Sequence, residues 1–99
     1  MRRVVWADAA QDDYLEILRY IAEDDPDAAE RVVRAIEETG NRLADFATGR
    51  PGRVSGIYEK SIARLPYFLA YALSENGTVL TIVHVIHTSR DWPPDNWPA

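Results

Sequence analysis

The sequence contains no cysteine, which excludes disulfide bonds, a cysteine nucleophile and cysteine-ligated zinc. It also lacks an apolar run long enough to cross a bilayer. The start, Met1-Arg2-Arg3-Val4-Val5-Trp6, is followed at once by Ala7-Asp8, so we expect no signal peptide, which would need a longer apolar stretch. We therefore expect a soluble cytoplasmic protein with no membrane partner. Its 99 residues are enough for one domain, residues 1–99, with a core of its own.

Motifs that hold cofactors or activate nucleophiles are missing as well. The chain has no Gly-x-Gly-x-x-Gly, no Walker A sequence and no Gly-x-Ser-x-Gly. Its two histidines, His84 and His87, are three residues apart in a predicted strand, where their side chains point to opposite faces. Metal sites need clustered ligands, so we predict no metal site, no cofactor, and structural or polar-rim roles for both histidines.

Basic residues are too few for a dedicated nucleic-acid binder, since the net charge is −5. Residues 1–48 hold six arginines against twelve acids, whereas residues 49–90 hold five basic residues against two acids. We expect an acidic outer face in the first half and a surface for an acidic partner in the second. The neighbouring acids Asp12 and Asp13 are interpreted as solvated carboxylates on a helix. No direct sequence-specific nucleic-acid binding is expected.

Hydrophobic spacing predicts a short first strand at Val4–Trp6 and then two helices. Asp8 and Gln11 match a capping box, and the apolar residues from Ala10 to Ile21 recur on one helix face. Asp25-Pro26 predicts the start of a second helix, which continues to about residue 47. Gly40 within it indicates close packing on the first helix. A two-residue connection makes the pair an antiparallel αα-hairpin.

The second half of the chain predicts a loop and three strands. Residues 49–56 contain three glycines and a proline and form the loop, and residues 57–62, 67–73 and 78–86 are the strands. Asn76-Gly77 favours a tight hairpin between the last two. The last strand is apolar on both faces, so it is central or covered by a partner. The order β-α-α-β-β-β predicts an α+β fold, with the helical hairpin on one face of a small, mainly antiparallel sheet.

Three segments in a fixed order also carry a family resemblance. They are Gly49-Arg50-Pro51-Gly52, the Pro-Tyr-x-x-x-Tyr of residues 66–71, and the His-x-x-Arg-x-Trp-Pro of residues 87–93. Together they resemble the ParE branch of the RelE/ParE toxin superfamily of toxin–antitoxin modules. The resemblance covers nearly the whole chain, including Trp6 before the Ala-rich first helix. Tyr58 and His84 stand where that family often has arginine.

The resemblance implies a protein that inhibits DNA gyrase by binding and that a cognate ParD-like antitoxin neutralises. Such a protein is not an enzyme and needs exposed anchors, of which arginine and tryptophan are the typical hot-spot types. In the family pattern Trp92 is expected to pack, whereas Trp97 lies beyond the pattern and is expected to contact a partner. The candidate target- or partner-binding residues are Arg50, Arg53, Tyr58, His87, Arg90, Trp92 and Trp97.

Other readings remain open. A RelE-like, ribosome-dependent mRNA endonuclease would need a general base, a general acid and cations, for which the chain offers Tyr58, Lys60, Arg64, His84, His87 and Arg90. Members of that branch resemble one another in being strongly basic, and a pI of about 4.9 opposes this reading. An inactive or differently targeted relative, or a plain interaction domain, stays possible on sequence alone.

Overall fold

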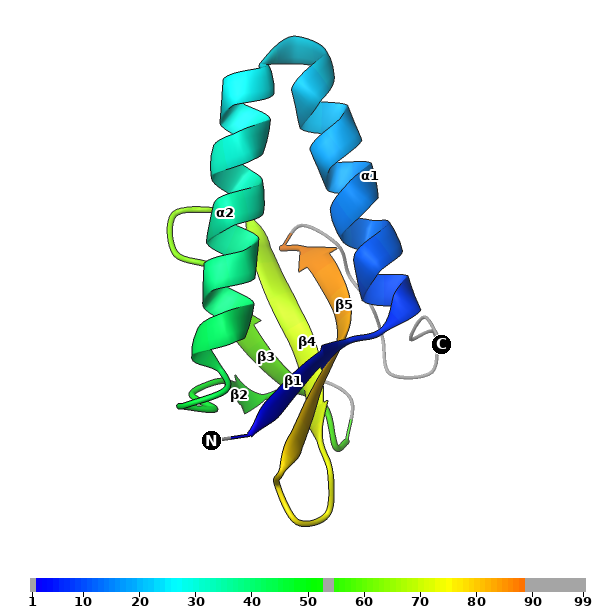
Figure 1. Cartoon of the computed structure of the whole chain (residues 1–99), viewed down its shortest axis with the longest axis vertical. Coiled ribbons are helices and arrows are strands. Elements are labelled where there is room, and N and C mark those ends of the chain that lie inside the picture. Colours follow the sequence, from blue (N-terminus) through cyan, green and yellow to red (C-terminus); the bar gives the residue numbers. More distant parts are fainter. Residues whose placement is uncertain (1, 53–54, 89–99) are drawn as a thin grey trace.

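A computed structural model describes residues 2–52 and 55–88 of the chain. Two helices form a hairpin on one face of a twisted sheet (Figure 1). The elements in chain order are β1 (Arg3–Trp6), α1 (Asp8–Asp24), α2 (Pro26–Arg42), β2 (Arg50–Pro51), β3 (Tyr58–Ser61), β4 (Tyr67–Leu73) and β5 (Val79–His87). This confirms the predicted α+β fold and its helical hairpin. None of the described helices is long and apolar enough to span a membrane.

The sheet has five strands in the order β1-β5-β4-β3-β2. β1 runs parallel to β5, and the remaining neighbours are antiparallel. The last strand therefore lies inside the sheet, between β1 and β4, as its apolar pattern predicted. The assignment of residues 49–56 entirely to a loop was wrong, because Arg50 and Pro51 pair with Glu59 and Tyr58. Proline is tolerated there because β2 is an edge strand.

The Asn-Gly hairpin between β4 and β5 is confirmed. Gly77 has a φ of +71°, a conformation that glycine adopts without steric cost. The Asn76 side-chain oxygen accepts hydrogen bonds from the hydroxyls of Ser74 and Thr78, at 2.9 and 2.7 Å. These hydrogen bonds stabilise the turn. The turn sets the register of β4 and β5, the two longest strands.

The two helices begin differently. At α2 the Asp25 carboxylate accepts the Ala28 N–H at 3.1 Å and Pro26 takes the first helical position, as predicted. The capping box at α1 was wrong: Ala7 is the capping residue, and Asp8 is already helical. The Gln11 amide donates instead to the Trp6 carbonyl at 3.0 Å. Asp8 still favours this end, because a carboxylate in the first turn offsets the helix dipole.

α2 ends at Arg42 rather than near residue 47, and residues 43–45 continue as turns. Gly40 does mark close packing, but the prediction that it packs on the first helix was wrong. A Cβ at Gly40 would lie 2.5 Å from Trp6 Cζ2 and 3.0 Å from Ile82 Cδ1. The glycine thus lets α2 sit directly on the ends of β1 and on β5.

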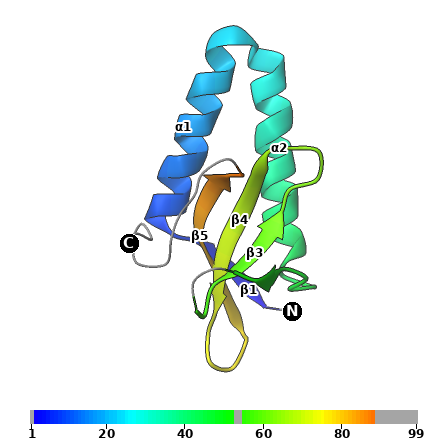
Figure 2. The ribbon, with the colours of Figure 1, turned by 180° about the vertical axis from the view of Figure 1, so that it is seen from behind.

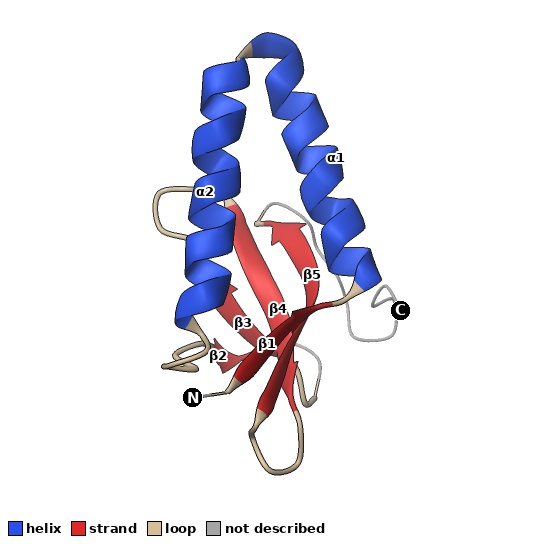
Figure 3. Cartoon of the chain, in the orientation of Figure 1, coloured by secondary structure: helices blue, strands red, loops and turns tan. Residues whose placement is uncertain are grey.

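The main core lies between the helices and the sheet, and it includes Ile36, Leu43, Leu69, Tyr71, Leu80 and Ile82. A smaller cluster of Phe68, Ala70 and Ile86 occupies the opposite face of the sheet. Figure 2 shows that face, where the described part of the chain places no helix. Figure 3 shows the resulting layers, with both helices in front of the strands.

Candidate partner-binding surfaces

Two of the predicted site residues lie at the β2–β3 edge of the sheet. Arg50 is exposed, with its guanidinium 3.9 Å from the Glu59 carboxylate, a distance and exposure at which an ion pair contributes little. Tyr58 stacks on Tyr71 with ring centroids 5.5 Å apart. The Arg50 side chain is therefore exposed to solvent, whereas the Tyr58 ring packs against Tyr71.

His87 lies at the other end of the sheet, edge-on to Tyr67 with ring centroids 5.2 Å apart. His87 contacts Tyr67, and Tyr58 contacts Tyr71. These two β4 residues are four positions apart, which is about 13 Å along the strand. The structure does not bring Tyr58 and His87 together. The other four candidates, Arg53, Arg90, Trp92 and Trp97, lie outside the described residues.

Asp13 was misassigned as a solvated carboxylate. Its Oδ2 lies 2.9 Å from His84 Nδ1 and accepts the backbone N–H of Val85 at 3.0 Å. β1 pairs with β5 as far as Ile82, so Asp13 occupies the edge of β5 just beyond that pairing. We call this contact the edge clamp. It joins α1 to β5, and the His84 ring in this contact is buried.

The signal for the clamp was present in the helical spacing. Asp13 follows the buried Ala10 by three residues, so it lies beside the apolar face of α1, while Asp12 lies away from it. A carboxylate in that position is more consistent with a buried polar partner than with solvent. The sequence alone could not show that this partner lies 71 residues away on β5.

A hollow of about 370 Å³ lies at the base of the helical hairpin. We call it the aromatic hollow, lined by Trp6, Gln11, Tyr14 and Glu37. The Trp6 and Tyr14 ring centroids are 6.4 Å apart with an interplanar angle of 53°. The Tyr14 hydroxyl donates to Glu37 Oε1 at 3.3 Å. Burial, and then the nearby Glu37 carboxylate, raise the pKa of Tyr14 above its usual value of 10.0.

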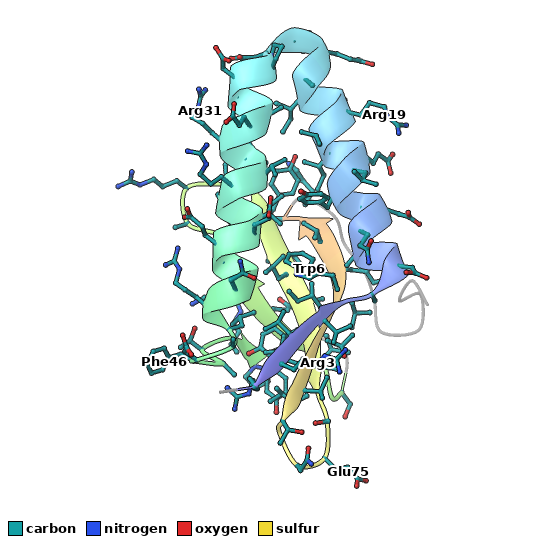
Figure 4. The ribbon with its side chains drawn as sticks, viewed as in Figure 1. Arg3, Trp6, Arg19, Arg31, Phe46 and Glu75 are labelled. Atoms are coloured by element: carbon teal, nitrogen blue, oxygen red, sulfur yellow. The ribbon has the colours of Figure 1, made fainter. Side chains whose placement is uncertain are left out.

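A second hollow of about 280 Å³ lies between the C-terminal end of α2 and β3. We call it the basic hollow because Arg42 and Lys60 are among its described lining residues, none of which is acidic. Phe46 also lines it and is 72% exposed, a large value for an aromatic side chain. Figure 4 shows Phe46 projecting away from the molecule. The two hollows therefore carry opposite charge, with α2 contributing to both.

Neither hollow resembles a metal centre. Across residues 2–52 and 55–88, no three histidine, aspartate or glutamate side chains are grouped so that they could hold a metal ion. The histidine geometry agrees with the strand alternation, since His84 falls on the face of Ile86 and His87 on the face of Val85.

The family model described as "ParE toxin of type II toxin-antitoxin system, parDE" matches residues 4–92 of this chain. The chain belongs to the ParE toxin family. A curated relative from Sinorhizobium fredii, named "Putative toxin Y4kP", is 40% identical over 93 residues, which cover 93% of this chain and 94% of the relative. The family resemblance seen in the sequence is thereby confirmed, and the chain is a toxin of the type II toxin–antitoxin class.

Solved structures share the fold of this ParE-family chain at low sequence identity. The chromosomal ParDE system of P. aeruginosa matches with a TM-score of 0.81 at 22% identity, covering 90% of this chain and 98% of the other. The RelBE2 complex of Mycobacterium tuberculosis matches with a TM-score of 0.62 at 22% identity, covering 87% and 96%. The YoeB/ParE toxin of Agrobacterium tumefaciens gives 0.59 at 17% identity, covering 86% and 96%. These likenesses support the fold.

Proposed function

We propose that this toxin acts by binding and inhibiting DNA gyrase in the cytoplasm, and that a ParD-like antitoxin neutralises it. The observation that carries the proposal is the match of residues 4–92 to the ParE family model, together with the 40% identical relative. Poisoning by binding requires exposed anchors rather than a nucleophile, and the exposed Arg50 and Phe46 side chains are of types that serve as such anchors.

Three features of the described residues favour binding over RNA cleavage. General acid–base cleavage needs both groups within hydrogen-bond reach of one phosphate, and Tyr58 and His87 lie at different ends of β4. His84 is buried, with Nδ1 against Asp13. The net charge of −5 disfavours approach to ribosomal RNA.

An antitoxin partner is proposed because two structural neighbours are described as toxin–antitoxin assemblies, the ParDE system and the RelBE2 complex. The fold offers a partner two hollows of opposite charge and several exposed apolar side chains. Leu15 and Tyr20 on α1 are 48% and 73% exposed. A segment that folds on binding can cover such dispersed surface.

Regulated expression in a bacterium tests the proposed mode of action. We expect filamentous cells and an induced DNA-damage response while translation continues, because a poisoned gyrase leaves cleaved DNA. Co-expression of an adjacent small gene product should restore growth. Arrested translation with cleaved mRNA, lost on changing His84, His87 or Tyr58 to alanine, would replace the proposal with the RelE-like nuclease. Normal growth would indicate an inactive relative.

A further inference from the structure

The aromatic hollow combines the groups that recognise a basic side chain, and none of its described lining residues is basic. Among the described residues, its lining consists of Trp6, Gln11, Tyr14 and Glu37. Figure 4 shows Trp6 between the two helices, while Arg19 and Arg31 point outward from α1 and α2. The described lining therefore offers aromatic faces and a carboxylate, with no cation among these residues to pair with them.

Two aromatic rings form the walls of this hollow. The Trp6 and Tyr14 planes are inclined at 53°, so they make an open corner rather than a closed stack. A cation within about 6 Å of such a ring is attracted by its electron-rich face, and tryptophan gives the strongest attraction. Gly40 contributes by letting the Trp6 ring approach the α2 backbone, where any Cβ would collide with it.

Glu37 supplies the negative charge on the α2 side. Its Oε1 accepts one hydrogen bond from Tyr14, but a carboxylate has about four acceptor positions, so it can also pair with a guanidinium. The Tyr14 hydroxyl donates its hydrogen bond to this carboxylate at 3.3 Å and so holds it beside the rings. The wider surroundings have the same sign, since residues 2–48 carry six arginines against twelve acids.

We propose that the aromatic hollow receives an arginine side chain of the antitoxin, with the guanidinium stacked on Trp6 or Tyr14 and paired with Glu37. Arginine is favoured over lysine because its planar group can stack on a ring and pair with a carboxylate at the same time. The volume of about 370 Å³ is sufficient for such a side chain. The identity of the partner rests on the proposed function, whereas the chemistry of the hollow does not.

The first test uses a small probe and the free toxin. Nα-acetyl-L-arginine amide is titrated while the Trp6 indole N–H signal is followed by NMR, after assignment with Trp6→Phe. Nα-acetyl-L-citrulline amide serves as the neutral control of nearly the same shape. We expect saturable binding on the order of millimolar for the arginine probe, and binding about fivefold weaker or more for citrulline.

Two single-charge variants separate the site from general electrostatics. Glu37→Gln should abolish the preference for arginine over citrulline, whereas Glu38→Gln should preserve it, because both glutamates are exposed on α2 but only Glu37 lines the hollow. Equal binding of the two probes, no saturable shift of the Trp6 signal, or an equal effect of both variants would overturn the assignment.

The second test uses the antitoxin encoded beside the toxin gene. Glu37→Gln should weaken the purified complex about tenfold or more, and Glu38→Gln less than about twofold. An unchanged affinity for Glu37→Gln would overturn the proposal even if the free probe binds. If the toxin does not affect gyrase but binds the arginine probe and loses antitoxin affinity on Glu37→Gln, only the proposed gyrase target is contradicted. Failure of the arginine site and failure of the proposed function are therefore distinguishable.

Discussion

The two helices are attached to the sheet by different means. α2 buries five residues, namely Ala29, Val32, Ile36, Thr39 and Gly40, and Gly40 lies against Trp6 and Ile82 of the sheet. Within α1, Ala10 alone is buried, and the apolar residues on its inner face are half-buried. α1 packs on β5 through these residues and is also joined to it by the edge clamp, in which one carboxylate serves both the His84 ring and the Val85 backbone.

This difference separates the part of the molecule that maintains the fold from the part available to a partner. The apolar contacts of α2 exclude water and continue into the core through Leu43. α1 lies over the upper edge of β5 and leaves Leu15 and Tyr20 largely exposed. We therefore expect α2 to tolerate few substitutions, and α1 to tolerate many outside the clamp.

The largest expected effect comes from the core side of α2. Ile36 is fully buried, so Ile36→Ala leaves a cavity and should lower the free energy of unfolding by about 3–4 kcal/mol. Ile17→Ala on the half-buried face of α1 should cost about 1–2 kcal/mol. Urea unfolding followed by circular dichroism measures both. Equal losses of unfolding free energy for Ile36→Ala and Ile17→Ala would contradict the proposed difference between α2 and α1.

The edge clamp gives the next largest effect. Asp13→Ala leaves the buried His84 ring and the Val85 N–H without this acceptor and should cost about 2–3 kcal/mol. The Val85 amide should also exchange its hydrogen faster. Asp12→Ala removes an exposed carboxylate from the adjacent position and should change stability by less than about 0.5 kcal/mol. If Asp12→Ala costs as much, the clamp does not hold α1.

Gly40→Ala tests the close approach of α2 to the sheet. Alanine favours a helix by about 1 kcal/mol, but its methyl group would lie 2.5 Å from the Trp6 ring. We expect a net loss of about 1–2 kcal/mol and a displaced Trp6 signal in NMR spectra. A stabilised variant with an unchanged Trp6 environment would show that this contact is relaxed in solution.

The smallest expected effect is a dependence on alkaline pH. Burial is the main cause of the raised pKa values of Tyr14, Tyr67 and Tyr71, above 10.0 in the folded state. Below pH 10 both states are protonated and the full stability is present. Above pH 10 the unfolded chain loses protons first, so the free energy of unfolding falls. In Tyr14→Phe the free energy of unfolding, measured by urea titration between pH 8 and 11, should fall less steeply with pH. The same dependence on pH as in the unmodified protein would contradict a raised pKa for Tyr14.

Local chemistry made much of the fold predictable. The Asp25-Pro26 start of α2, the Asn76-Gly77 turn and the apolar central strand each depend on short-range rules, and the structure confirms them. The errors involve contacts between distant segments. The pairing of Arg50 with Glu59, the Gly40 contact with Trp6 and the Asp13 contact with His84 all depend on which elements meet in space.

The candidate site was less predictable for the same reason. Single residues such as Arg50, Tyr58 and His87 were identified by type and by family pattern, but the structure places the last two at different ends of the sheet. The aromatic hollow combines Trp6 and Tyr14 with Glu37 from the second helix, and their proximity follows from the hairpin geometry. No spacing rule within one element could have grouped them.

The central claim is that this ParE-family toxin inhibits gyrase by binding. The most direct test adds the purified toxin to purified gyrase and relaxed plasmid DNA, with a parallel incubation of translating ribosomes and mRNA. The account predicts that supercoiling falls and cleaved DNA accumulates with toxin concentration, while the mRNA stays intact and added antitoxin reverses the inhibition. Unaffected gyrase together with cleaved mRNA would contradict it.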